Sequence, residues 1–116
     1  MSYIHKNLAA GRWYELSLIE QMANIGSEVH RTFQRYKEKD TQRFQSAFER
    51  ALELFDLTLN DKRWGKGRKE IARCREFFCD FFVGENEYNF TAGWFEKYFM
   101  EFAIAAQMLR YKNITS

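Results

Sequence analysis

The segment 40–60 places apolar side chains at the three- and four-residue spacing that is typical of one face of an α-helix. The stripe and its two flanks consist of Phe44, Ala47, Phe48, Ala51, Leu52, Leu54, Phe55, Thr58 and Leu59. A face this broad is expected to contact more than one neighbouring helix. At 1.5 Å per residue the helix is roughly 30 Å long, which sets the long dimension of a small domain.

Three further segments repeat this pattern over similar lengths. They run from about 12 to 36, from 68 to 83 and from 91 to 112, and short polar stretches join them. Proline is absent, which suits uninterrupted helices. Because helices joined by short loops pack as antiparallel neighbours, the sequence predicts an all-α fold. We expect an antiparallel up-down-up-down four-helix bundle that forms a single domain over residues 1–116.

Residues that favour helix ends lie near the expected boundaries. The first helix is expected to be continuous from about Arg12, and Gly84 is expected to end the third helix in the left-handed conformation. Short polar side chains accept hydrogen bonds from the free amides of a first turn. The candidate N-caps of this kind are Asn7, Asp40 or Thr41, and Thr91.

The three other helices also have one predicted inward face each. Small residues recur on three of the four helices, for example Gly26 and Ala106, and we expect them to pack against the twelve Phe rings without leaving voids. The predicted inward residues are Leu18, Met22, Ile25, Val29, Phe33 and Tyr36 in the first helix, Ile71, Cys74, Phe78, Phe81 and Phe82 in the third, and Phe95, Tyr98, Phe99, Phe102, Ala106 and Leu109 in the fourth.

Residues able to form a metal or catalytic site do not occur in the required patterns. Cys74 and Cys79 have no second Cys pair or nearby His, so we expect buried, reduced thiols and no zinc site. A di-iron bundle needs Glu-x-x-His units, and none is present. The acids are expected to form ion pairs instead. These acids are Glu49, Asp56, Glu76 and Asp80, and the expected partners are Arg31, Arg50, Arg73 and Arg75.

The sequence also lacks the elements of acyl or phosphoryl transfer. His30 is the single histidine inside a predicted helix, and we expect it to be a hydrogen-bonded boundary residue. No Gly-rich phosphate loop, nucleophile elbow or Cys-His pair is present. We therefore expect no enzymatic activity and no cofactor. The first twenty residues lack the apolar run of a signal peptide, and no run is long enough to span a membrane, so we expect a cytoplasmic protein.

The most suggestive segment for function joins the second and third helices. It runs from Lys62 through Arg73 and Arg75 into the third helix, and it carries seven basic side chains and one Trp with few acids between them. Gly65 and Gly67 mark a turn there, which lets cations reach phosphates while Trp64 stacks on a base, as in proteins that bind single-stranded nucleic acid. The predicted nucleic-acid-binding residues are Lys62, Arg63, Trp64, Lys66, Arg68, Lys69 and Arg73.

Other interpretations of the sequence stay open. The basic segment is alternatively a solvated loop in which Lys62 and Arg63 cap the second helix and Trp64 packs under the end of the bundle. A helical adaptor without nucleic acid would use the spare aromatic side chains Tyr88, Phe90 and Trp94 as a protein interface. A third hypothesis is a small-molecule binder with a gap among the Phe rings.

Two of the predicted helices resemble a known family. Gln21-Met-Ala-Asn-Ile-Gly-Ser-Glu28 is similar to the first-helix signature of the small four-helix-bundle proteins encoded by intervening sequences in bacterial 23S ribosomal RNA genes. In the second helix, Phe44 to Leu54 includes Arg50-Ala-Leu-Glu-Leu54, which resembles a Gly-Ser-Leu-x-Glu-Leu motif of that family. The sequence departs from the family at Gly26-Ser27, and at Ala47 and Ala51 in place of a Gly-Ser pair.

The resemblance carries expectations of its own. The same fold is used by the accessory variability determinant of diversity-generating retroelements, a basic ring-shaped bundle that binds a reverse transcriptase and nucleic acid. The resemblance therefore implies a homo-oligomer, a ring in that protein, with RNA or DNA and a reverse transcriptase as partners. The matching residues Asn24, Ile25 and Glu28 would be structural, and the family supplies no catalytic residue.

Overall fold

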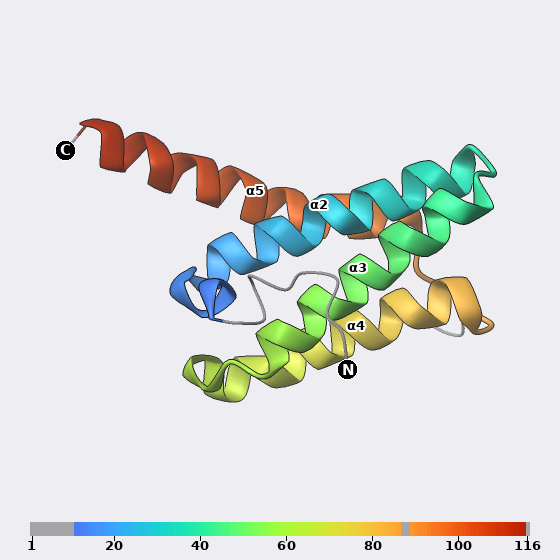
Figure 1. Ribbon diagram of the computed structural model, residues 1–116, viewed down its shortest axis with the longest axis horizontal. Helices are drawn as coiled ribbons and strands as arrows, with labels where there is room; N and C mark the ends of the chain where they lie inside the picture. Colours follow the sequence, from blue (N-terminus) through green and yellow to red (C-terminus); the bar gives the residue numbers. More distant parts are fainter. Residues whose placement is uncertain (1–10, 87–88, 116) are drawn as a thin grey trace.

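The computed structural model describes residues 11–86 and 89–115, and these residues contain helices and no strand (Figure 1). The all-α prediction is therefore confirmed for the described chain, which has four α-helices and two short 3-10 helices. The elements in order are η1 (Arg12–Glu15), α2 (Leu18–Lys37), α3 (Thr41–Leu59), η2 (Lys62–Gly67), α4 (Arg68–Val83) and α5 (Ala92–Thr115).

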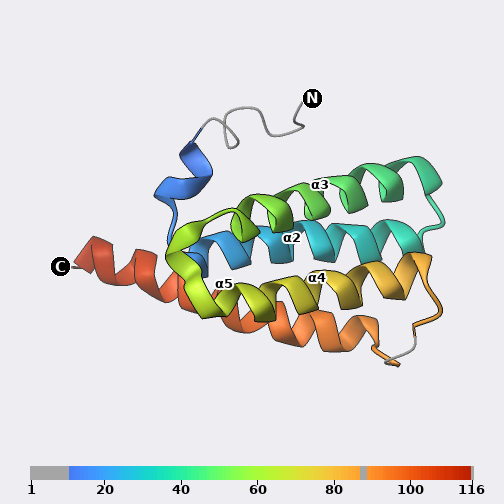
Figure 2. The same cartoon turned by 90° about the horizontal axis from the view of Figure 1, so that it is seen from below.

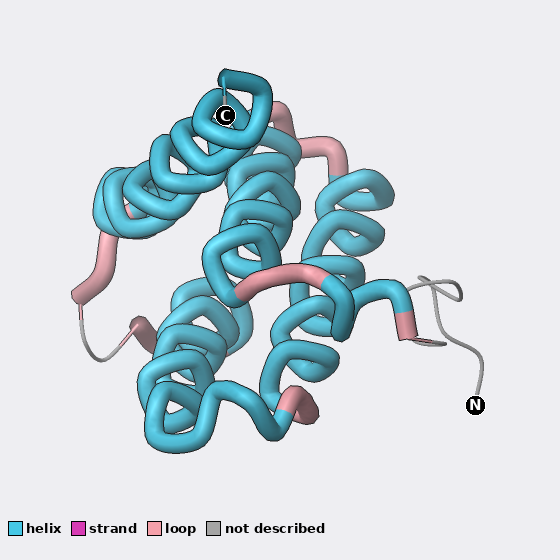
Figure 3. Tube along the Cα trace, turned by 90° about the vertical axis from the view of Figure 1, so that its left-hand side faces the viewer, coloured by secondary structure: helices cyan, strands magenta, loops and turns pink. Residues whose placement is uncertain are grey.

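The helices surround a common interior. α2 packs against both α3 and α5, and α3 packs against α4. Figure 1 shows α3 between α2 and α4, and Figure 3 shows the four helices from one end. The gap between α4 and α5 is bridged by long side chains, including Phe81 with Phe95 at 6.2 Å between ring centroids. These contacts are compatible with a four-helix bundle.

Phe side chains from all four helices fill the interior. Phe55, Phe78 and Phe95 are completely buried, and they come from α3, α4 and α5. Phe33 of α2 contacts Phe78 edge-on at 6.2 Å and Phe95 at 5.5 Å between centroids. Such ring pairs add roughly 0.5–1.5 kcal/mol each beyond the burial of their area. The interior is therefore one continuous cluster of rings, as the helical spacing of the Phe residues predicts.

A small residue lets α2 and α5 approach each other closely. A Cβ atom at Gly26 would lie 2.8 Å from Cβ of Phe99, so the ring-bearing helix rests directly on the α2 backbone. Phe99 is 5% exposed. This contact confirms the expectation that small residues oppose large rings, at the interface where α5 is anchored.

The first predicted helix is interrupted. We expected continuous helix from about Arg12, but η1 ends at Glu15, Leu16 is extended with φ −82° and ψ 149°, and α2 starts after Ser17. Ser17 and Glu20 form a capping box: the Glu20 amide donates to Ser17 Oγ at 3.2 Å, and the Ser17 amide donates to Glu20 Oε1 at 3.1 Å. This reciprocal cap stabilises a new helix start at Leu18, so η1 and α2 do not form one continuous helix.

The other helix ends agree with expectation in most cases. Asp40 caps α3 through the Arg43 amide at 3.1 Å, and Thr91 accepts from the Trp94 amide at 3.1 Å. The prediction for Gly84 is wrong, because its φ of −105° and ψ of −158° are extended. Asn86, with φ 50°, takes the left-handed conformation instead, and its amide donates to the Asp80 carbonyl. The candidate cap Asn7 lies outside the described residues.

Two predicted inward residues lie at the surface. Tyr36 is 56% exposed, although its ring contacts Phe44 and Phe82, and Leu109 is 39% exposed. The C-terminal part of α5 projects past the other helices (Figures 1 and 2). α5 also continues to Thr115, a few residues beyond the expected end. Among the described residues, no helix has the length and apolar character needed to cross a bilayer.

The close contact at Gly26 gives a test of the packing. We expect Gly26→Ala to destabilise the protein by roughly 1–3 kcal/mol, since the new methyl group overlaps Phe99. The matched control is Gly67→Ala: Gly67 has helical φ and ψ of −63° and −19° and no atom within 4 Å of a Cβ. That variant is expected to change stability by less than about 1 kcal/mol, because the reduced freedom of the unfolded chain stabilises it while Ala is less favourable than Gly at a helix N-cap. Urea unfolding of both variants measures the difference, and equal effects would contradict the packing described.

Candidate nucleic-acid interface

The basic segment between α3 and α4 folds as a short 3-10 helix that leads directly into α4. Asp61 starts it by accepting the Arg63 amide at 3.1 Å. Gly65 interrupts it with φ 49° and ψ −117°, a conformation that a residue with a side chain adopts only under strain. The expected turn is thus present at Gly65, and the residues on both sides of it are helical.

A buried glutamine ties this segment to the rest of the chain. Gln21 of α2 is completely buried. Its Nε2 donates to the Trp13 carbonyl at 2.9 Å and to Asp61 Oδ2 at 3.0 Å. Its Oε1 accepts from Trp64 Nε1 at 2.9 Å. One side-chain amide of α2 therefore joins η1 to η2 and to Asp61, the N-cap residue of η2.

A second buried hydrogen bond reinforces the same corner. Trp13 Nε1 donates to Thr58 Oγ1 at 2.9 Å, and both residues are at most 1% exposed. The sequence analysis did not identify Trp13, Gln21 or Asp61 as a group. The Ser17-x-x-Glu20 pattern is the one sequence feature that hints at this grouping. It predicts a helix start at that position, which places Gln21 in the first turn, beside the chain that precedes the helix.

Arg63 is held by the protein itself. Its Nη2 lies 2.6 Å from Asp61 Oδ2 and donates to the Leu16 carbonyl at 2.7 Å. The hydrogen bond from Arg63 holds the pKa of Asp61 below its usual range, although burial of the carboxylate opposes that shift. Arg63 was predicted to contact phosphate. In the alternative, Arg63 caps the second helix, but its contacts are with Asp61 and with the Leu16 carbonyl, which precedes α2.

Trp64 is also held by contacts within the protein. Its ring is half-buried against the core, its indole N–H is used by Gln21, and the Arg63 guanidinium carbon lies 4.3 Å from the ring centroid. A base approaching that face of the ring would have to displace Arg63. This arrangement also agrees with the alternative in which Trp64 packs under the bundle end.

The remaining cations of the segment are exposed. They surround the start of α4, whose N-cap residue Gly67 makes no side-chain hydrogen bond to the first turn. Cations at this end oppose the helix dipole by roughly 0.3–1 kcal/mol each, and a bound anion would offset that cost. These exposed cations are Lys62, Lys66, Arg68, Lys69 and Arg73.

The charge of the chain is concentrated in this segment. Residues 61–73 contain six Lys and Arg against Asp61 and Glu70, a net charge of +4. The whole chain has a net charge of +2, so the other residues together carry −2. Asp61 is paired with Arg63, and Glu70 accepts a hydrogen bond from Tyr98 at 3.1 Å. The five exposed cations consequently present positive charge with little local compensation.

The two cysteines and His30 are the other side chains that the sequence analysis considered for chemistry. Cys74 is buried, and desolvation raises the pKa of its thiol to about 12, so it stays protonated at neutral pH. Cys79 is only half-buried, in contrast to our expectation. His30 is exposed, with Nδ1 3.8 Å from Glu96 Oε1. In the described chain no three His, Cys, Asp or Glu side chains lie close enough together to hold a metal ion.

One of the expected ion pairs links two helices. Arg75 of α4 lies with Nε 2.9 Å from Asp56 Oδ1 of α3. Arg31 pairs instead with Glu28 of its own helix at 2.9 Å, so that part of the prediction is wrong. Exposed pairs of this kind contribute roughly 0–1 kcal/mol.

The aromatic side chains proposed for an adaptor interface pack mainly against each other. Phe90 lies 4.4 Å from Phe77 and 4.4 Å from Trp94 between centroids, and Trp94 stacks on Tyr98 at 5.3 Å. Trp94 keeps 38% exposure. Tyr88 lies outside the described residues. Of the two described side chains of this set, Trp94 offers the larger exposed area to a partner.

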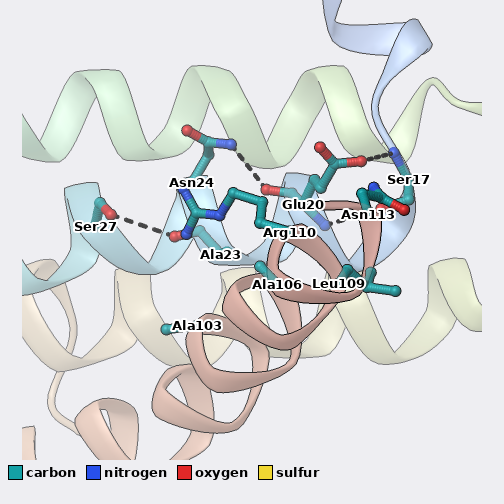
Figure 4. A pocket seen from close by; sticks show the side chains of 10 residues that line it. All are labelled: Ser17, Glu20, Ala23, Asn24, Ser27, Ala103, Ala106, Leu109, Arg110 and Asn113. Carbon is teal, nitrogen blue, oxygen red and sulfur yellow. Dashed lines mark hydrogen bonds between the residues drawn. The ribbon is translucent and has the colours of Figure 1, made fainter. Parts of the chain in front are cut away.

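A groove of about 380 Å³ lies between α2 and α5 (Figure 4). Small residues such as Ala23, Ala103 and Ala106 line it, so it does not match the expected gap among Phe rings. Its polar groups are largely used by the α2 backbone: Asn24 donates to the Glu20 carbonyl at 2.8 Å, and Ser27 Oγ lies 3.3 Å from the Ala23 carbonyl. Ser17, Glu20, Arg110 and Asn113 also line the groove, so it is bordered mostly by polar residues.

Comparison of the chain with family models, curated proteins and solved structures found no match. The resemblance to proteins of ribosomal RNA intervening sequences and to the accessory variability determinant thus rests on the residues quoted for it, and it stays a prediction.

The Asp61 carboxylate gives a pH test of the anchored segment. Its pKa in the folded protein lies below the ordinary value of 3.8, so its contribution to stability is complete above that pH and is lost as the pH falls through the folded-state pKa. We expect Asp61→Asn to lower the free energy of unfolding at pH 7 by roughly 1–3 kcal/mol, as for a charged hydrogen bond. Below about pH 4 the difference from wild type should shrink.

Urea unfolding of both proteins between neutral and acid pH measures this difference. The control is Asp56→Asn, because Asp56 pairs with Arg75 at the surface with 55% of its side chain exposed. Removing such an exposed pair changes stability by roughly 1 kcal/mol or less. A difference between wild type and Asp61→Asn that stays constant with pH would contradict the role assigned to Asp61.

Proposed function

We propose that this protein is a non-enzymatic accessory protein that binds RNA or DNA through the basic segment, and that its four helices form an antiparallel up-down-up-down bundle. The observation that carries the proposal is the concentration of charge: +4 over residues 61–73 in a chain whose other residues sum to −2. The electrostatic attraction of phosphates supplies most of the affinity of sequence-independent binding.

The residues of the segment have two different roles in this proposal. Lys62, Lys66, Arg68, Lys69 and Arg73 are exposed and contact phosphates. Arg63 and Trp64 keep the segment in shape through Asp61 and Gln21. Preorganised cations lose less conformational entropy on binding, which favours affinity. The proposal therefore does not depend on Trp64 stacking on a base.

Charge reversal tests the proposal. Replacing Lys66, Arg68 and Lys69 by Glu should abolish binding of single-stranded RNA or DNA. Neutralising the same three side chains with Gln should weaken binding and reduce the slope of log K against log salt by about 2, since each contact with single-stranded phosphate contributes about 0.7. Fluorescence anisotropy of a labelled oligonucleotide at several salt concentrations measures both effects.

A matched control lies at the other end of the molecule. Lys37, Lys39 and Arg43 flank the loop between α2 and α3, opposite η2 in Figure 1. Replacing these three by Glu changes the net charge by the same amount and should reduce the affinity much less. Equal losses in the two triple variants would mean that only the total charge matters. Absence of binding by the wild type at every salt concentration would favour the adaptor interpretation.

A further inference from the structure

Helix α4 changes the sign of its charge along one side. Lys69, Arg73, Glu76 and Asp80 follow each other at steps of four, three and four residues, which keeps them on one side of a helix that turns about 100° per residue. Lys69, Arg73 and Glu76 are exposed, and Asp80 is half-buried. The first half of this side is therefore basic, and the second half is acidic.

The sequence shows the same change over a longer stretch. Residues 61–75 contain seven Lys and Arg against Asp61 and Glu70, a net charge of +5. Residues 76–101 contain Lys97 against six Asp and Glu, a net charge of −5. The basic part of the chain thus ends within one helical turn of Arg73, where residues of the opposite sign begin.

Two carboxylates border the basic segment on the side of α5. Tyr98 of α5 donates its hydroxyl hydrogen to Glu70 Oε1 of α4 at 3.1 Å, so Glu70 faces α5. Glu101 lies one turn after Tyr98, and both carboxylates belong to exposed residues. Burial raises the pKa of Tyr98, and the charges of Glu70 and Glu101 are among those that raise it further. Both carboxylates therefore lie near the same hydroxyl group.

A duplex would bring a second row of phosphates close to these acids. Its two backbones face each other across grooves about 6 and 12 Å wide. Asp80 lies about 10 Å further along α4 than Arg73, at 1.5 Å per residue. When one backbone lies on the cations, the second is thus as far away as the carboxylates are. Like charges that meet there are only partly screened, because the Debye length is about 10 Å at 0.1 M salt.

A single strand avoids this repulsion. It has only one backbone, and its flexible chain can leave the surface beyond Arg73 instead of continuing over Glu76. Its phosphates can then contact the exposed cations without any phosphate resting beside a carboxylate. The charges around the basic segment therefore suit one strand better than two.

We propose that Glu70, Glu76 and Glu101 determine the specificity of the nucleic-acid site: they exclude a second phosphate backbone, so the site takes a single strand and rejects a duplex. This inference rests on the proposed function. The discrimination comes from repulsion of the wrong ligand, which is a common source of specificity. It needs no ring that stacks on a base, and Trp64 is in any case engaged by Gln21 and Arg63.

Fluorescence anisotropy with two forms of one labelled oligonucleotide tests the inference. The single strand is an oligothymidylate of about 16 nucleotides, the upper site size of a small single-strand-binding fold, and the duplex is the same strand paired with oligoadenylate. Oligouridylate, alone and paired with oligoadenylate, gives the RNA arm. The higher charge density of a duplex by itself favours duplex binding. We nevertheless expect wild type to bind the single strand about tenfold more tightly at about 0.1 M salt, because the duplex is repelled.

The double variant Glu76→Gln, Glu101→Gln tests the residues. It removes two carboxylates and leaves the hydrogen bond between Tyr98 and Glu70 in place. The duplex should gain more affinity than the single strand, so the preference should shrink by at least about threefold. The matched control is Glu38→Gln with Glu85→Gln, which changes the net charge by the same amount. Both residues are exposed and follow the last turns of α2 and α4, at the end of the molecule opposite η2 (Figure 1), so this variant should keep the wild-type preference.

The possible results separate the two proposals. Wild type that binds the duplex as tightly as the single strand would overturn this inference and leave the proposed function intact. A Glu76→Gln, Glu101→Gln variant with wild-type circular dichroism and an unchanged preference would overturn the role of the carboxylates. Absence of binding to either form at every salt concentration would contradict the proposed function, and this inference with it.

Discussion

The side-chain amide of Gln21 is the interaction on which the end of the molecule that carries the basic segment depends. It makes three hydrogen bonds in a fully buried position, to Trp13, Asp61 and Trp64. A formed hydrogen bond contributes only about 1 kcal/mol net, but a buried partner left without one costs about 1–3 kcal/mol. Four segments of the chain are therefore held in one arrangement, and the position of the basic segment follows from a residue about forty positions earlier in the sequence.

Much of the fold is predictable because the helical pattern is local. The starts of α3 and α5 follow from caps and from apolar spacing within a few turns, and Asp40 and Thr91 act as expected. The break before Ser17 was missed because it depends on tertiary contacts. Trp13 finds its hydrogen-bond partner Thr58 forty-five residues away, and this contact holds η1 against the end of α3 instead of letting it continue into α2.

The candidate site shows the same division between local and distant causes. A sequence reveals that cations gather between Lys62 and Arg73, and the structure keeps most of them at the surface. It does not reveal that Asp61 is buried, because the packing of α2 and η1 over α3 causes that burial. Once Asp61 is buried, the nearest guanidinium must compensate it. Arg63 is therefore withdrawn from the group of free cations that its place in the sequence suggested.

Helix α5 shows why periodicity alone does not decide which face is inside. The spacing of Phe95, Phe99 and Ala106 and the spacing of Met100, Ile104 and Met108 are both helical, and each set would suit a buried face. The ring-rich interior accepts the Phe face because Gly26 of α2 leaves room for Phe99. The other face has no helix of the same chain to cover it, since α5 packs closely against α2 alone among the described helices. The apolar area that stays in water on that face does not contribute the roughly 25 cal/mol per Å² that its burial would provide.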